Sequence, residues 1–279
     1  MRKDAFLRKL HTTMKRKLGI NAGCLYGISE LDALEKIKEA GFETFFTGSF
    51  TKDGDPDEIR NRADELGLVY EFIHAPFGGI NEMWMPGLGY LTMFNAMKRS
   101  IDFAADNGVP YVITHVSSGW TPPQVNDLGL ERYDDIVLYA KDRGVTVAFE
   151  NLRMLGNLAV LVDRYEKMDN VRYCFDCGHE HCYTKTVKWM DIFTTKTCCT
   201  HIHDNVGRPF DNKVDDFDQH LLPFDGTYDY EQMMRKLDEY GYSGSLTLEV
   251  GQHRPEYKAM SPEAFLATCY ERIKKISEM

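Results

Sequence analysis

The chain alternates two kinds of segment along most of its length. Polar stretches with apolar residues at i, i+3 and i+4 are followed by short runs of β-branched and aromatic residues. The first pattern is typical of amphipathic helices and the second of buried strands. Eight strands are predicted, at residues 18–24, 43–48, 68–74, 110–115, 145–150, 171–176, 198–203 and 245–249.

The ends of the predicted helices are marked by residues that suit helix caps. Ser29, Asp55 with Pro56, and Ser261 with Pro262 stand where N-caps are expected. Five helical stretches are followed by a glycine that can adopt the left-handed conformation of a C-terminal cap. These glycines are Gly41, Gly67, Gly108, Gly144 and Gly241. Each leads directly into a strand, which predicts repeated strand–helix units with short connections.

Eight such units favour a parallel sheet, and eight is the number of strands at which a parallel sheet closes. The 279 residues, 43% of them hydrophobic, match the ~250 residues that such a barrel uses. We therefore predict an α/β fold, a single-domain (β/α)8 TIM barrel over residues 18–279, preceded by a basic helical extension at 1–17. An open doubly wound sheet fits less well, because LYGIS follows the first strand where G-x-G-x-x-G would be expected.

Composition narrows the classes of partner. With 33 basic and 43 acidic residues, the formal charge of -10 makes nucleic acid an unexpected partner. No window approaches the ~20 apolar residues of a membrane span. Seven scattered cysteines do not form a paired secretory framework, and the N-terminus has no apolar signal-peptide centre, so free thiols and a cytoplasmic location are expected.

The candidate chemistry lies where the predicted strands end. Six consecutive strands end in side chains that bind metals: His74, His115, Glu150, Asp176, the pair His201 and His203, and Glu249. Because the carboxyl ends of barrel strands open on one face, these side chains are expected to converge. The following loops add His179, Arg208, Asp218 and His220. A site made of two glutamates, one aspartate and one histidine is rich in oxygen ligands and has a single imidazole. Such a site suits a hard or borderline divalent ion, so Mn²⁺ is expected, with Mg²⁺, Co²⁺ and Zn²⁺ as alternatives.

Several short motifs resemble the xylose-isomerase-like superfamily of barrels, which includes sugar isomerases and epimerases, inosose dehydratases and apurinic-site endonucleases. They are HAPF, FEN, FDCGH, HIHDN with a following DQH, and LTLE. The resemblance implies one divalent metal held by Glu150, Asp176, His201 and Glu249, with His203 as the alternative to His201. It also implies that His179 and Arg208 hold substrate oxygens.

The resemblance further implies a mechanism on a small carbohydrate. The ion would chelate adjacent oxygens of an open-chain sugar, and Glu150 and Glu249 would move a proton through an enediolate from opposite faces. His74, His115 and Trp120 are expected to contact substrate. Ketose epimerases of this group carry a further glutamate one turn beyond the fifth strand, whereas residues 151–160 contain no carboxylate. The sequence therefore does not indicate which sugar is the substrate.

Three other functions remain in view. His74, His115, Glu150, Asp176, His179, His201, Asp218, His220 and Glu249 resemble the nine ligands of three zinc ions in apurinic-site endonucleases. Charge and the sequence HIHD, where that pattern has asparagine before the aspartate, oppose this reading. An inosose-dehydratase-type lyase and a non-catalytic carbohydrate-binding barrel are the others. Phe77, Trp84 and Trp120 would enclose a sugar, and the alternative for the two tryptophans is the interface of a homo-oligomer.

Overall fold

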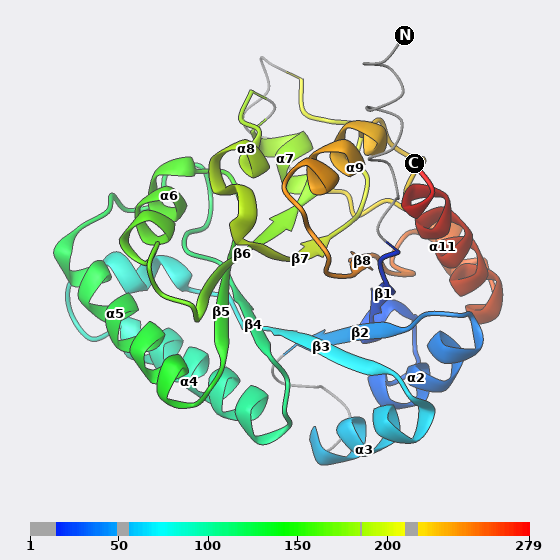
Figure 1. The fold of residues 1–279 in the computed structure, drawn as a ribbon, viewed down its shortest axis with the longest axis horizontal. Helices are drawn as coiled ribbons and strands as arrows, with labels where there is room; N and C mark the ends of the chain where they lie inside the picture. Colours follow the sequence, from blue (N-terminus) through cyan, green and yellow to red (C-terminus); the bar gives the residue numbers. More distant parts are fainter. Residues whose placement is uncertain (1–14, 49–55, 185, 210–216) are drawn as a thin grey trace, which may run out of the picture.

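The computed structural model describes residues 15–48, 56–184, 186–209 and 217–279, and it contains eight parallel strands with helices around them (Figure 1). The strands are β1 (Leu18–Asn21), β2 (Thr44–Gly48), β3 (Val69–His74), β4 (Tyr111–Thr114), β5 (Thr146–Glu150), β6 (Val171–Asp176), β7 (Thr197–His201) and β8 (Leu246–Leu248). They pair in the order β7-β6-β5-β4-β3-β2-β1-β8. A parallel bridge from Ile202 to Leu248 joins the two ends of this series, so the predicted single-domain (β/α)8 barrel is confirmed.

The helices pack on the outside of the strands (Figure 1). The α-helices are α2 (Glu30–Glu39), α3 (Pro56–Leu66), α4 (Tyr90–Asp106), α5 (Asp127–Asp142), α6 (Leu155–Arg164), α7 (Cys177–Tyr183), α8 (Trp189–Phe193), α9 (Tyr230–Glu239), α10 (Pro255–Lys258) and α11 (Pro262–Ser277). Three short 3-10 turns are η1 (Ala22–Cys24), η2 (Ile80–Trp84) and η3 (Thr194–Lys196). None of the helices in the described ranges has the length and apolar character needed to cross a bilayer.

The predicted helix boundaries agree with the structure. All five glycines expected as caps have positive φ, between 62° and 105°. The Ser29 and Ser261 side chains accept hydrogen bonds from backbone N–H groups three residues later. Asp55 lies outside the described residues, and α3 begins at Pro56. The first strand is shorter than predicted, because residues 22–24 turn into η1.

The predicted extension at 1–17 lies mostly outside the described residues. Residues 15–17 have no regular secondary structure. Arg16 is buried there, donating to the carbonyl oxygen of Tyr242 and forming a 2.6 Å ion pair with Asp238 of α9. This pair attaches the start of β1 to the end of the barrel where the strands begin.

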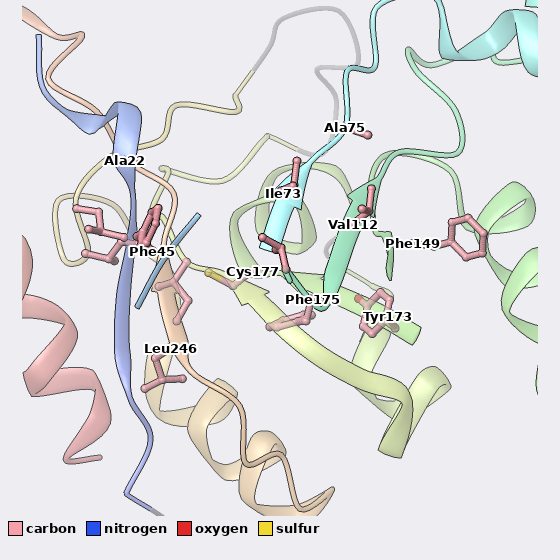
Figure 2. Packing of buried hydrophobic residues seen from close by; sticks show 14 of the residues in the cluster. Ala22, Phe45, Ile73, Ala75, Val112, Phe149, Tyr173, Phe175, Cys177 and Leu246 are labelled. Carbon is pink, nitrogen blue, oxygen red and sulfur yellow. The ribbon is translucent and has the colours of Figure 1, made fainter. Parts of the chain in front are cut away.

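Alternation along the strands separates two hydrophobic layers. Phe45, Ile73, Val112, Phe149 and Leu246, on β2, β3, β4, β5 and β8, belong to the layer between strands and helices (Figure 2). The other strand face fills the barrel interior with Phe46, Phe72, Ile113, Ala148, Cys174 and Cys199. Because the side-chain period of a strand is two, the residues two positions beyond these interior residues face the mouth of the barrel. The side chains that follow in this alternation, at the mouth of the barrel, are the metal-ligand candidates His74, His115, Glu150, Asp176 and His201.

Candidate metal centre and active site

Four of the predicted ligands meet at the mouth of the barrel. Nδ1 of His201 lies 2.9 Å from Oε1 of Glu150, 3.3 Å from Oε2 of Glu249 and 3.9 Å from Oδ2 of Asp176. One potential ligand atom from each of the four residues lies within 4.8 Å of all the others. Glu150, Asp176 and His201 are buried, whereas 22% of the Glu249 side chain is exposed. The structure thus brings together the four residues predicted to hold one metal, with His201 rather than His203 among them.

The charges in this group stabilise one another. Burial raises the pKa of Glu150, but His201 and His115 outweigh burial and hold it well below its ordinary value. Burial likewise opposes ionisation of Glu249, and His201 and His220 lower its pKa overall. In return, Glu249 and Glu150 overcome the burial of His201 and raise its pKa to about 10. The group therefore keeps its carboxylates ionised by holding positive charge beside them.

A divalent cation fits this donor set. Three carboxylates and one imidazole nitrogen supply the oxygen-rich environment that Mn²⁺ and Mg²⁺ prefer. Metal ligands must be deprotonated, so a cation would replace the proton that the carboxylates hold on His201. Asp176 is also fixed in place, because its Oδ1 accepts a 2.6 Å hydrogen bond from the backbone N–H of His179 at the start of α7.

A second group surrounds the other oxygen of Glu150. Nε2 of His74 and Nε2 of His115 both lie 3.1 Å from Oε2 of Glu150. Burial lowers the pKa of His115, and the nearby Glu150 offsets this only in part. Phe77 stacks on the His115 ring, with centroids 4.4 Å apart. Both histidines thus contact a metal-ligand candidate, and both line the cavity where substrate contact was predicted.

A third group forms on the other side of Asp176. It contains His179, His203, Asp218 and His220, again with potential ligand atoms within 4.8 Å of one another. Nε2 of His179 lies 3.1 Å from Oδ2 of Asp218, and Nε2 of His220 lies 3.4 Å from Oδ1. Burial opposes charge on His220, but Asp218 outweighs it and raises the pKa of the imidazole to about 10. His203, the predicted alternative to His201, belongs to this group, 3.2 Å from the Asp176 carboxylate.

Three histidines are oriented by backbone carbonyl groups. Nδ1 of His74 donates to the carbonyl oxygen of Ala75, over 2.8 Å. In the same way, Nδ1 of His179 donates to Asn151 and Nδ1 of His220 donates to Glu249, each over 2.9 Å. Such a bond fixes the tautomer and leaves Nε2 as the atom that can bind a cation. In each case Nε2 faces a carboxylate of the site.

Asn151 supports the site and was given no role from the sequence. Its side-chain oxygen accepts from the Tyr173 hydroxyl and the backbone N–H of Asp176, and its amide donates to the carbonyl oxygen of Asp176. Its own carbonyl oxygen accepts from Nδ1 of His179. The FEN motif contained the signal, because a polar residue directly after a strand-end ligand is placed to hold the next strand.

Two other predicted residues lie at the edge of the site. Nε and Nη2 of Arg208 donate to the carbonyl oxygens of Cys182 and Tyr183 at the end of α7. Trp120 contacts the Tyr183 ring edge-on, with centroids 5.6 Å apart. The expectation that Trp84 encloses a sugar or forms an interface is wrong, because Trp84 is buried and donates to the carbonyl oxygen of Val116.

These groups border a cavity of about 320 Å³ at the mouth of the barrel. Glu150, His179 and Glu249 line it together with Arg153 and Tyr183. Its volume is at the small end of the ~300–1,000 Å³ typical of ligand sites, which suits one small molecule.

A family model described as xylose isomerase-like TIM barrel matches residues 34–269. The chain belongs to this family. The resemblance seen in the strand-end motifs is therefore confirmed. An inosose isomerase of Halalkalibacterium halodurans is 24% identical over 234 residues, which cover 78% of this chain and 81% of that protein. The uncharacterized protein y4fM of Sinorhizobium fredii is 30% identical over 172 residues, which cover 57% of this chain and about half, 52%, of that protein.

Solved structures of sugar epimerases share the fold. The 3-keto-D-glucoside 4-epimerase of E. coli has a TM-score of 0.71 at 16% identity, over 95% of this chain and 100% of that chain. The D-psicose 3-epimerase of Clostridium cellulolyticum, solved with D-tagatose, has a TM-score of 0.72 at 14% identity, over 94% and 98%. At such identities the likeness establishes the architecture.

Proposed function

We propose that this chain is a divalent-metal-dependent isomerase or epimerase of a small sugar, sugar phosphate or polyol. The observation that carries the proposal is the meeting of Glu150, Asp176, His201 and Glu249 beside a cavity of about 320 Å³, which the two glutamates line. Solved structures with this fold are named as sugar epimerases, and a curated relative is named as an inosose isomerase. The cavity size matches one monosaccharide.

These four residues would hold the ion, with Mn²⁺ as first choice and Mg²⁺, Co²⁺ or Zn²⁺ as alternatives. A bound divalent ion supplies a Lewis acid that lowers the pKa of a C–H group beside a chelated carbonyl. Glu249 would move that proton, and its partly exposed side chain, which lines the cavity, supports this role. Glu150 would act from the opposite face of the substrate, and His201, His74 and His115 contact its two oxygens.

The test is a proton-exchange screen. Deuterium incorporation from heavy water would be followed by NMR on a panel of ketoses, aldoses and inososes with Mn²⁺ added. Exchange at one carbon is expected, and it should be lost in Glu249→Gln and Glu150→Gln but kept in Glu239→Gln, an exposed glutamate of α9. Loss of water from an inosose would indicate the lyase alternative. Sugar binding with no exchange in any probe would leave a non-catalytic barrel.

A second candidate function is phosphodiester cleavage by several metal ions. The observation that favours it is the division of the nine predicted ligands, with His203, into three groups linked through Glu150 and Asp176. Ions about 4 Å apart can stabilise the attacking and leaving oxygens of a phosphodiester. Metal analysis separates the two proposals, because three tightly bound zinc ions per chain together with cleavage of abasic-site DNA would replace the sugar isomerase.

A further inference from the structure

An arginine side chain is among the residues that line the cavity. Arg153 lies three residues beyond Glu150, in the loop after β5, and its side chain lines the cavity. It is the single arginine or lysine among the described residues that border this space. The protein has a net charge of -10, and Glu150, Asp218 and Glu249 also line the cavity, together with four histidines. Arg153 therefore adds a permanent positive charge to a cavity whose other charged groups are carboxylates and imidazoles.

The guanidinium group of Arg153 is held by Tyr183. Its Nη2 donates to the Tyr183 hydroxyl over 2.6 Å, and its Cζ lies 3.9 Å from the centre of the Tyr183 ring. The same ring stacks on His179, with centroids 5.4 Å apart and planes 25° apart. Tyr183 thus joins the arginine to the metal-ligand candidates, and it fixes the position of the charge relative to the floor of the cavity.

A second arginine adds positive charge to the same edge. Arg208 lies 4.5 Å from the centre of the Trp120 ring, and Arg153 lies 5.6 Å from it. Arg208 is anchored by the carbonyl oxygens at the end of α7. It contributes to the local potential from behind the aromatic pair Trp120 and Tyr183, while Arg153 is the arginine that lines the cavity.

We infer that Arg153 binds an anionic group on the substrate, either a phosphate monoester or a carboxylate. A guanidinium group presents several N–H donors in a planar fork that matches both kinds of oxyanion, and it cannot accept a hydrogen bond from a sugar hydroxyl. The inference rests on the proposed function in one respect, because it assumes that the reacting end of the sugar lies at Glu249 and His201. It narrows the substrate class to acidic sugars.

Binding measurements test this without turnover. The Mn²⁺-loaded protein would be titrated calorimetrically with D-fructose 6-phosphate and D-fructose, and with D-glucuronate and D-glucose. These two pairs compare a phosphate and a carboxylate with their neutral counterparts. The variants are Arg153→Gln, Arg153→Lys and Arg235→Gln. Arg235 is an exposed residue of α9 outside the cavity, so its replacement controls for the loss of one positive charge.

At least one anionic probe is expected to bind more tightly than its neutral counterpart. Arg153→Gln should weaken that probe by about 10- to 100-fold and collapse the anionic-to-neutral affinity ratio, because hydrogen bonds to charged groups are worth that much. Arg153→Lys should restore part of the ratio, and Arg235→Gln should leave it unchanged. An anionic preference that survives in Arg153→Gln places the anion on another positive charge of the site and overturns the inference. Equal binding of anionic and neutral probes by the unaltered protein also overturns it.

The proton-exchange screen separates this inference from the proposed function. Anion selectivity that depends on Arg153 with no exchange in any acidic sugar would refute the isomerase and keep the subsite. Exchange on a neutral sugar without anionic preference would keep the isomerase and refute the subsite.

Discussion

The imidazoles of His203 and His220 stack face to face, with ring centroids 3.9 Å apart and planes 6° apart. The backbone of Gly178 packs directly against the His203 ring, because a Cβ added to Gly178 would lie 2.0 Å from that ring. Gly178 is the second residue of α7, so the helix backbone itself holds His203 in place.

Gly178→Ala should therefore disrupt the third ligand group. Insertion of a methyl group into a packed interior costs about 1–3 kcal/mol of unfolding free energy, and displaced His203 would lose its contacts with His220 and Asp176. Urea unfolding and Mn²⁺ titration measure both effects. Gly156→Ala is the matched control, because its added methyl group meets no atom within 4 Å at an exposed position of α6 and should stabilise the helix by about 0.4–1 kcal/mol. Equal behaviour of the two variants would contradict the packing described.

Divalent-cation binding should release protons. The neighbouring carboxylates raise the pKa of His201 to about 10, so at neutral pH this imidazole carries a proton that a cation must displace. Mn²⁺ affinity should therefore increase as pH rises toward 10 and weaken as pH falls. Calorimetric titration in two buffers of different ionisation enthalpy counts the protons released. A count of zero at pH 7 would contradict a protonated His201 in the cation-free protein.

Glu71 should make the barrel less stable as pH rises. It is buried inside the barrel, hydrogen-bonded by Ser245 and Thr247, and burial raises its pKa despite these bonds. A carboxyl group with a raised folded-state pKa contributes stability below its unfolded pKa of ~4.3, and this contribution is lost as pH rises through the folded value.

Glu71→Gln removes that titration while keeping a group that can accept the same hydrogen bonds. The variant should gain stability over the unaltered protein as pH rises from 4.5 to 7.5, by about 1.4 kcal/mol for each unit by which the folded pKa is raised. Guanidinium unfolding across this range measures the difference. A constant difference between the two proteins would mean that Glu71 titrates normally.

Asn151→Ala should lower both the stability of the protein and its affinity for Mn²⁺. The change removes three buried hydrogen bonds to Tyr173 and Asp176, which predicts a loss of about 2–4 kcal/mol of unfolding free energy. It also frees Asp176 to move, so Mn²⁺ affinity should fall by at least tenfold, as measured by calorimetry. Asn170→Ala, which removes one hydrogen bond to Val137 far from the ligands, should cost about 1 kcal/mol and leave the affinity unchanged.

Much of the fold could be read from the sequence because local signals and topology agree. Gly41, Gly67 and Gly144 adopt the positive φ that their positions after helices require. The alternation of side chains along the strands also places the candidate site. Glu150 lies on the same strand face as the interior residue Ala148, and His201 on the same face as Cys199, so their side chains converge at the mouth of the barrel.

Long-range contacts made the remainder invisible to sequence reasoning. Trp84 stands in a segment between strands, and only its packing against Gly129 and its bond to Val116 show that it is core. The role of Asn151 depends on β5 and β6 being neighbours at a particular register. Asp204 follows His203 in the HIHDN motif. Its side chain accepts from the backbone N–H groups of Asn205, Phe224 and Tyr228, so it orders the loop that carries His220.

The barrel closes between β7 and β8, where Ile202 pairs with Leu248 and Glu249 donates its backbone N–H to Ile202. His201 and Glu249 stand on the two sides of this narrow seam. A cation shared by them would therefore cross-link β7 and β8, the two ends of the pairing order. Loss of the ion should make this junction open faster, so amide exchange should be quicker at Ile202 and Glu249 than at the β4–β5 pair.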